Sequence, residues 1–315
     1  MPAVRRITGR EQLQLVRHRN RYGIDDRALR RSAFRGELTK LRSGAFVETA
    51  LWDALGDEDR ARLEVAAAWE AGRGFFVASH ASAAALWEVP RISTPDGLVH
   101  SLTSLAAGTR TEHGVRKHAA KDLEQHVVAV HGIACTSLER TIVDLAMTEP
   151  FADAVVAADW ALREHTSKDA IARVLDELSP GRGRRRVEQV IDFADPRAGS
   201  AGESFSRTLI AEHGFPAPVL QQRFDDEHGL IGFVDFYWPD QALVGEFDGL
   251  VKYRDPGLLQ GRSPEDVVIA EKLREDRLRA TGARCTRWVW ATLRRPGELA
   301  AQLRLAGLPS RGRRA

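Results

Sequence analysis

The segment GFVDFYWPDQALVGEFDGLVKY, residues 232–253, constrains local structure more than any other part of the chain. Its two halves, 233–238 and 242–247, are rich in aromatic and β-branched residues, which favour strands. The three residues between them, Pro-Asp-Gln, are typical of a turn. We therefore predict a β-hairpin, and with it a sheet in this half of the chain.

The predicted hairpin carries three carboxylates. Side chains alternate along a strand, so Glu246 and Asp248 project from one face. A turn that pairs Trp238 with Leu243 also places Asp235 opposite Glu246, and cross-strand neighbours lie about 5 Å apart. Three acids this close are tolerated only with a bound cation or a shared proton. For a cation, oxygen ligands favour Mg²⁺ or Mn²⁺ over zinc. The alternative is a polar outer face on an edge hairpin, because charges also mark sheet edges.

Length and composition indicate a globular protein of two or three domains. The chain has 315 residues, of which 43% are hydrophobic and 29% charged. No apolar run reaches the roughly 18 residues of a membrane span, and the N-terminal MPAVRRITGR lacks the apolar core of a signal peptide. Two cysteines, Cys135 and Cys285, are too few for a disulfide framework and lack zinc-ligand spacing. We expect a cytoplasmic protein that does not contact membranes.

Positive charge is concentrated at the N-terminus. Residues 1–42 contain twelve Lys or Arg against four acids, so they carry +8 while the rest of the chain sums to −6. A basic head on an acidic body predicts a nucleic-acid-binding module.

The order of elements in this head points to the same function. A capping box at residues 8–11 opens a helix through Arg21, and a second helix over 27–35 ends at Gly36. A hairpin with Gly44 near its turn follows. We predict a winged helix-turn-helix over residues 1–50 that binds double-stranded DNA. Its predicted DNA contacts are Arg27, Arg30, Arg31 and Arg35 on the helix and Lys40 and Arg42 on the wing. The alternative is a helical head whose arginines only favour solubility.

The middle region, residues 51–195, is predicted to be an α+β domain. Helices are expected at 57–70, 79–88 and 138–147, and strands at 98–103 and 125–130. No His-x₃-His or HExxH spacing is present, so we interpret the histidines here as solvated or core side chains: His113, His118, His126 and His131. Arg140 and Asp144 are four residues apart on one predicted helix, and we interpret them as a surface ion pair.

The last region, residues 196–310, is predicted to be an α/β domain. Ser200 and Glu203 form a capping box that opens a helix over 201–213, and the hairpin, a charged helix and a final strand follow. A glutamate that caps its own helix needs no other role. Because Glu203 precedes the hairpin, it is also a further candidate acid for the site.

Two families resemble parts of the chain. The segments GIDDRALRRSAFRGELTKLRSGAFV, VASHASAAALWEVP and TSLERTIVDLA resemble the AbiEi antitoxins of type IV toxin–antitoxin systems, over about the first 195 residues. The segments GESFSRTLIAEHGFPAP, VDFYWPD, VGEFDGLVKY and AEKLREDRLRATGARCTRW resemble DUF559 proteins, a PD-(D/E)xK nuclease branch related to very-short-patch repair endonucleases. Together they imply an α+β multidomain chain with a winged helix, an α+β middle domain and a restriction-endonuclease-like domain.

The nuclease resemblance implies a metal-dependent DNA endonuclease. In it, Asp235 and Glu246 are the motif acids, Glu203 is the helix acid, and Asp235, Glu246 and Asp248 hold Mg²⁺ or Mn²⁺. Asp248 stands where the superfamily has its lysine, and Lys252 is the candidate replacement. The bound metal would activate water for attack on a DNA phosphodiester.

Three C-terminal arginines are candidates to hold phosphate beside this site: Arg274, Arg277 and Arg287. On a helix this charged, pairing of Arg274 with Glu271, or of Arg277 with Glu275, is an equal alternative. The antitoxin resemblance implies a second function, a transcriptional autorepressor with a non-catalytic nuclease-like domain and a cognate toxin as partner.

Overall fold

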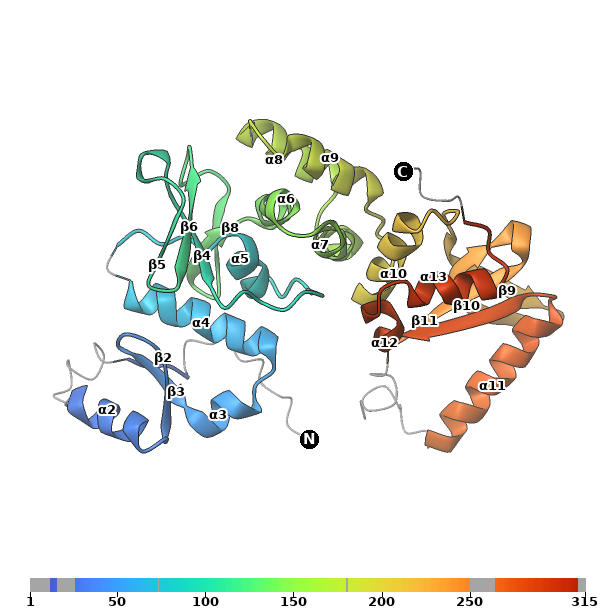
Figure 1. Cartoon of the computed structure of the whole chain (residues 1–315), viewed down its shortest axis with the longest axis horizontal. Helices are drawn as coiled ribbons and strands as arrows, with labels where there is room; N and C mark the ends of the chain where they lie inside the picture. The colour runs from blue at the N-terminus through green and yellow to red at the C-terminus, as the bar shows by residue number, and fades with distance from the viewer. Residues whose placement is uncertain (1–11, 16–25, 73, 180, 250–263, 311–315) are drawn as a thin grey trace. The chain divides into compact units, whose positions relative to one another are not determined.

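The structure is a computed structural model, and it describes residues 12–15, 26–72, 74–179, 181–249 and 264–310. The chain divides into two units, Met1–Glu149 with Thr166–Ile191 and Pro150–His165 with Asp192–Ala315. Each unit combines helices with sheets, so the predicted α+β class is confirmed (Figure 1). In the part of the chain described, no helix is long and apolar enough to cross a membrane.

The N-terminal part of the first unit is a helix packed on a three-stranded sheet of order β1-β3-β2. Leu29, Leu38 and Phe46 form the hydrophobic core between helix and sheet. Gly36 ends the helix with φ +78°, and Gly44 makes the hairpin turn with φ +80°, both where the sequence predicts them. The elements are β1 (Gln14–Leu15), α2 (Asp26–Phe34), β2 (Leu38–Arg42) and β3 (Ala45–Glu48).

The first predicted helix is wrong over part of its length. Gln14 and Leu15 lie inside it, yet they form β1 and pair with Phe46 and Ala45. This pairing satisfies main-chain groups of β3 from a distant segment, which local capping signals do not reveal. The rest of that predicted helix, before residue 12 and from 16 through 21, lies outside the described residues.

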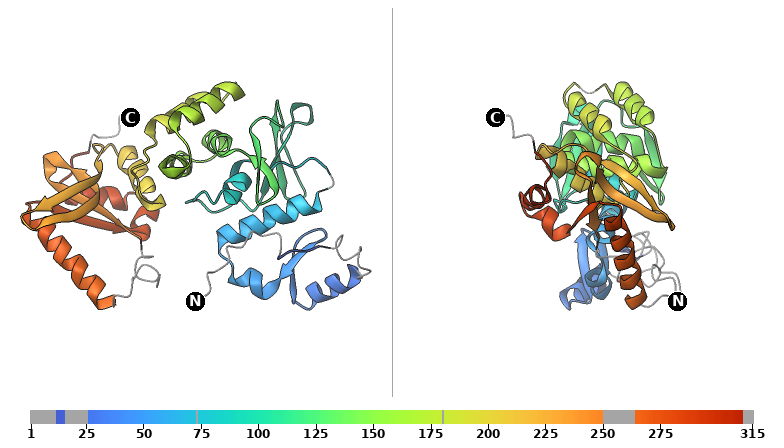
Figure 2. Two further views of the ribbon diagram at one scale, coloured as in Figure 1. Left: turned by 180° about the vertical axis from the view of Figure 1, so that it is seen from behind. Right: turned by 90° about the vertical axis from the view of Figure 1, so that its right-hand side faces the viewer.

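The rest of the first unit is an α+β body. Ala78 bridges Ser101 of β4 and Cys135 of β8, and so joins the β4-β6-β5 sheet to the β7-β8 hairpin. Helix α4 lies between the N-terminal hairpin and this sheet (Figures 1 and 2). The elements are α3 (Thr49–Ala54), α4 (Asp57–Ala71), α5 (His80–Leu86), β4 (Val99–Ser104), η1 (Leu105–Ala107), β5 (Arg110–Glu112), β6 (Val115–Ala120), β7 (Val127–Val130), β8 (Ile133–Thr136), α6 (Leu138–Thr148), α8 (Lys168–Leu178) and α9 (Arg184–Phe193).

The second unit is built on a four-stranded sheet of order β12-β11-β10-β9, in which only β11 and β12 are parallel. The predicted hairpin is confirmed, because Trp238 of β10 pairs with Leu243 of β11. The elements are α7 (Phe151–Glu164), α10 (Ala201–Glu212), β9 (Val219–Asp226), β10 (Gly229–Trp238), η2 (Pro239–Gln241), β11 (Leu243–Asp248), α11 (Pro264–Ala280), β12 (Arg284–Val289), α12 (Trp290–Arg294) and α13 (Glu298–Leu305).

Helices cover both faces of this sheet (Figure 2). Leu243 and Phe247 point into a cluster with residues of α10, α12 and α13, whereas Val244 points into a cluster with Leu278 of α11. The alternation follows from the two-residue period of a strand. It places Glu246, two residues after Val244, on the side of β11 that α11 covers.

Candidate functional site

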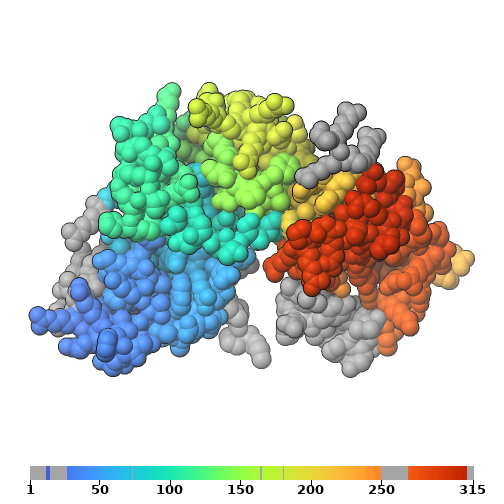
Figure 3. Space-filling view, in the orientation of Figure 1, coloured from blue at the N-terminus to red at the C-terminus, as the bar shows by residue number. Residues whose placement is uncertain are grey.

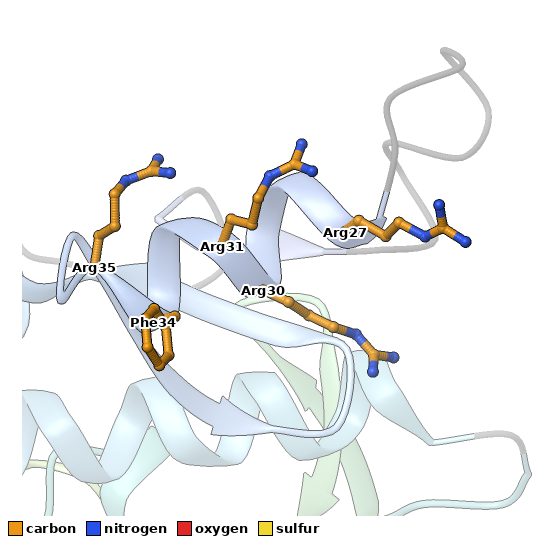
Figure 4. A pocket seen from close by; sticks show the side chains of 5 residues that line it. All are labelled: Arg27, Arg30, Arg31, Phe34 and Arg35. Carbon is orange, nitrogen blue, oxygen red and sulfur yellow. The ribbon is translucent and has the colours of Figure 1, made fainter.

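One face of α2 gathers the arginines predicted to bind DNA. A helix repeats every 3.6 residues, so positions 27, 30, 31 and 34 share one side of α2, while Leu29 points the other way into the core. The outward side chains, shown in Figure 4, are Arg27, Arg30, Arg31, Phe34 and Arg35. The four helix arginines predicted from sequence therefore lie together, with an aromatic ring among them.

These five side chains line an open hollow of about 510 Å³. Phe34 is 94% exposed, although it is an aromatic residue. Arg35 forms a two-point ion pair with Glu37, at 2.6 and 2.9 Å, on the surface. In the space-filling view the α2 region lies at one end of the first unit (Figure 3). The face is thus open to a large, flat or grooved partner.

The two predicted wing residues differ in their surroundings. Lys40, on β2, is exposed to solvent. Arg42 instead donates to the carbonyl oxygens of His113 and Gly114, at 3.0 and 3.1 Å. Burial lowers the pKa of Arg42, and the nearby charge of Glu64 only partly opposes this. Arg42 therefore holds the hairpin against the β5–β6 turn.

The carboxylate of Asp235 lies where β10 and β11 diverge. The paired register of the two strands runs from Trp238 opposite Leu243 to Phe236 opposite Gly245, and Asp235 is the next residue of β10 toward the N-terminus. Its Oδ2 accepts a hydrogen bond of 2.8 Å from the backbone N–H of Phe247. Its Oδ1 lies 3.3 Å from Nε2 of Gln221 on β9. The side chain therefore substitutes for a ladder hydrogen bond between the strands.

Glu203 is linked to Asp235 through the same glutamine. Nε2 of Gln221 donates to Oε2 of Glu203 at 3.0 Å. The capping box predicted at this helix start is confirmed: Glu203 accepts from the Gly199 N–H at 2.7 Å and from the Ser200 hydroxyl at 2.8 Å, and its own N–H donates to Ser200 Oγ at 3.2 Å. Gln221 is the member of this set that the sequence did not single out.

Glu246 is held by two arginines. Nη2 of Arg274 lies 2.7 Å from Oε1, and Nη2 of Arg287 lies 2.9 Å from Oε2. Glu271 contacts both guanidinium groups, at 3.2 and 2.9 Å. Burial by itself raises the pKa of Glu246, but the hydrogen bond and charge of Arg274, and then those of Arg287, outweigh burial and lower this pKa. Glu246 is therefore a paired carboxylate.

The remaining predicted residues of this region are more scattered. Asp248, at the end of β11, is half-buried. Arg277 pairs with Asp226 at 2.6 Å, not with Glu275 as one alternative suggested. Lys252 lies outside the described residues.

The described side chains do not fit a bound divalent metal in this arrangement. Within residues 12–15, 26–72, 74–179, 181–249 and 264–310, no three His, Cys, Asp or Glu side chains are grouped closely enough to hold an ion. Both oxygens of Glu246 already accept from guanidinium groups, which supply the positive charge that a metal would bring.

A cluster of three histidines in the first unit, His80 and His100 buried and His118 half-buried, was not predicted. His100 Nδ1 lies 2.9 Å from His118 Nε2, and the ring of His80 stacks on His118 with centroids 3.6 Å apart. Burial, followed by the charges of His100 and Arg116, lowers the pKa of His118 to about 4. The three histidines come from α5, β4 and β6, so their spacing in the sequence holds no signal of the cluster.

The ion pair beside this cluster corrects another prediction. Arg140 and Asp144 of α6 are buried, with 3% and 4% of their surface exposed, and not at the surface as interpreted from their spacing. Their closest N–O distance is 3.8 Å. Burial raises the pKa of Asp144 to about 7, while Arg140 opposes this rise. The prediction placed this face of α6 at the surface because an Arg and an Asp four residues apart form the same sequence pattern on a buried and on an exposed helix face.

Comparison with known proteins gives relatives but no function. The chain is 30% identical over 178 residues to an uncharacterized protein of Mycobacterium tuberculosis strain CDC 1551, and equally to one of strain H37Rv. The match covers 55% of this chain and 62% of each relative, so the chain spans less than two thirds of their length. No family model matches the chain.

Proposed function

We propose that the protein binds double-stranded DNA through α2 and the β2–β3 hairpin, as a winged helix-turn-helix. The observation that carries this proposal is the outward face of α2, where three arginines of the helix and Arg35 directly after it line one open hollow. Guanidinium groups bind phosphates and guanine edges, and an α-helix fits the major groove. The exposed Lys40 on the hairpin supports a second contact with the backbone.

A binding titration with salt tests this proposal. The full chain is titrated onto a fluorescent duplex between 50 and 300 mM NaCl, and we expect affinity to fall steeply because phosphate binding releases counterions. Arg31→Ala should weaken binding and reduce the slope of log K against log [salt] by about 1. Arg173→Ala, an exposed arginine on α8, is the matched control and should change neither quantity. Absence of binding at low salt would refute the proposal.

We further propose that the protein acts by occupying DNA and that its C-terminal domain, similar to PD-(D/E)xK nucleases, is non-catalytic. Two observations favour this over cleavage. Glu246 is neutralised by Arg274 and Arg287, and Asp248 occupies the position where the resemblance places a lysine. Such a protein suits the role of an autorepressor and antitoxin, with a cognate toxin as partner.

The competing function is metal-dependent endonuclease activity, which the closeness of Asp235 to β11 would serve. Incubation with supercoiled plasmid and Mg²⁺ or Mn²⁺ distinguishes the two. We expect no nicking above that of the Asp235→Asn variant. Nicking by the wild type that this variant loses would establish the endonuclease and reject the occupancy proposal.

A further inference from the structure

Phe34 is an aromatic side chain on a face that is otherwise cationic. It lies three, four and seven residues after Arg31, Arg30 and Arg27, and it lines the same hollow as they do. In Figure 4 its ring points downward, as the side chain of Arg30 does, while Arg31 extends upward. With 94% of its surface exposed, it takes no part in the core formed by Leu29 on the opposite side. The side chains beside it on this face are arginines, which are charged and do not cover the ring with apolar groups. Folding therefore does not account for a phenylalanine at this position.

The chemistry of the DNA grooves indicates which group of DNA this ring would contact. In the major groove, the apolar feature of the base edges is the C5-methyl group of thymine, which aromatic and aliphatic side chains contact. A minor groove of about 6 Å is too narrow for a helix about 10 Å across, so the α2 face can enter only the major groove. Arginines on the same face would bring the ring to the base edges as they bind phosphates and guanine.

Resting on the proposed DNA binding, we propose that Phe34 is a specificity-determining residue that reads thymine by contact with its C5-methyl group. The phosphate contacts of the arginines then supply most of the affinity, which does not depend on sequence, and Phe34 adds discrimination between sites. The two roles are separable, because an apolar contact releases no counterions and leaves the salt dependence of binding unchanged.

The test uses the full chain and a duplex site selected by the wild type from a random pool. Each thymine of that site is replaced in turn by uracil, which removes only the methyl group. We expect one replacement to weaken wild-type binding by about fourfold, the effect of burying a single methyl group. The same replacement should leave the binding of Phe34→Ala unchanged. That variant should lose about tenfold in affinity for the selected site, with the same salt slope and the same affinity for a scrambled duplex.

Three controls keep the outcome clear. Phe75→Ala removes another exposed phenylalanine of the first unit and should match the wild type on every duplex. A circular dichroism melt establishes that Phe34→Ala is folded, which its full exposure leads us to expect. Arg31→Ala should change the salt slope where Phe34→Ala does not.

Several results would overturn the inference. Uracil replacements that cost the wild type nothing, or that cost Phe34→Ala equally, would show that the ring does not touch a thymine methyl. Equal losses on selected and scrambled duplexes would assign Phe34 a role without sequence reading. Tighter binding of the wild type to single strands than to duplex would indicate base stacking instead. If the wild type binds no DNA at low salt, the proposed function itself fails, which is a separate result from these.

Discussion

Replacement of Glu246 by glutamine distinguishes a carboxylate that stabilises the fold from one that serves as a metal ligand. The variant keeps the shape of the side chain and removes the charge that faces Arg274 and Arg287. In a cluster of acids, loss of one charge relieves repulsion and stabilises the metal-free protein. In an arginine-bound carboxylate, the same loss leaves Arg274 and Arg287 facing a neutral amide, with Glu271 as the acidic contact that they still share, and destabilises the protein.

The exposure of these three side chains sets the expected loss in the free energy of unfolding. The side chain of Glu246 is 15% exposed, and those of Arg274 and Arg287 are 23% and 34% exposed. A hydrogen bond to a charged group contributes about 1.5–3 kcal/mol, and a fully buried ion pair costs about 3–5 kcal/mol to break. Because this cluster is partly hydrated and glutamine can still accept one bond, we expect a loss of about 2 kcal/mol in the free energy of unfolding.

The assay is urea unfolding in EDTA, followed by tryptophan fluorescence. Trp238, Trp288 and Trp290 all lie in the second unit and report on its unfolding. With an m value of about 2 kcal/mol/M, the midpoint should fall by about 1 M. Asp240→Asn, which removes an exposed acid from the turn of the same hairpin, is the control and should leave the midpoint unchanged. A Glu246→Gln midpoint above that of the wild type would refute the reasoning.

The pH dependence gives an independent check. The folded-state pKa of Glu246 is lowered from its ordinary 4.5. A carboxylate of this kind contributes stability above its unfolded pKa and loses it as pH falls through the lowered folded pKa. The difference between wild type and variant should therefore be constant from about pH 8 to 5.5 and shrink in stronger acid.

Three further outcomes are expected. Gly202→Ala should cost about 3 kcal/mol in urea unfolding, because the added Cβ would lie 2.0 Å from the ring of Phe247. Lys40→Ala should reduce the salt slope of DNA binding by about 1, whereas Arg42→Ala should lower the stability of the first unit and leave that slope unchanged. The stability of the first unit should fall as pH drops from about 6.5 towards 4, because His118 stays neutral in the folded protein while the unfolded chain already binds a proton there. His118→Gln should reduce this pH dependence, measured by urea midpoints at each pH.

Each of these has a control or a contradicting result. Gly249→Ala, whose Cβ meets Phe247 only at 3.4 Å, should unfold within about 0.5 kcal/mol of the wild type, and an equal loss in both variants would reject the steric argument. A change of salt slope in the Arg42 variant would show that its guanidinium leaves the two carbonyls to bind DNA. If His118→Gln does not alter the pH profile, another group causes the acid sensitivity. The raised pKa of Asp144 has the opposite effect, because stability is then lost as pH rises through about 7.

Local patterns were enough to predict much of the fold. The hairpin register that pairs Trp238 with Leu243, the helix cap at Glu203 and the left-handed Gly36 all follow from strand alternation, capping chemistry and backbone sterics. The arginine face of α2 follows from the helical period. In each case the deciding interaction joins residues close in sequence, so the sequence alone contains the information.

The sequence by itself thus determined which acids and arginines this protein offers, and on which faces of which elements most of them lie. Only the tertiary structure decided how they are paired. Glu246 meets Arg274 and Arg287, 28 and 41 residues away, and Arg42 reaches the carbonyl of His113, 71 residues away. Such contacts depend on how whole elements pack, and a carboxylate has the same sequence pattern whether it meets a guanidinium or a metal. The physical difference between a nuclease site and an ion-pair network therefore appears only after folding.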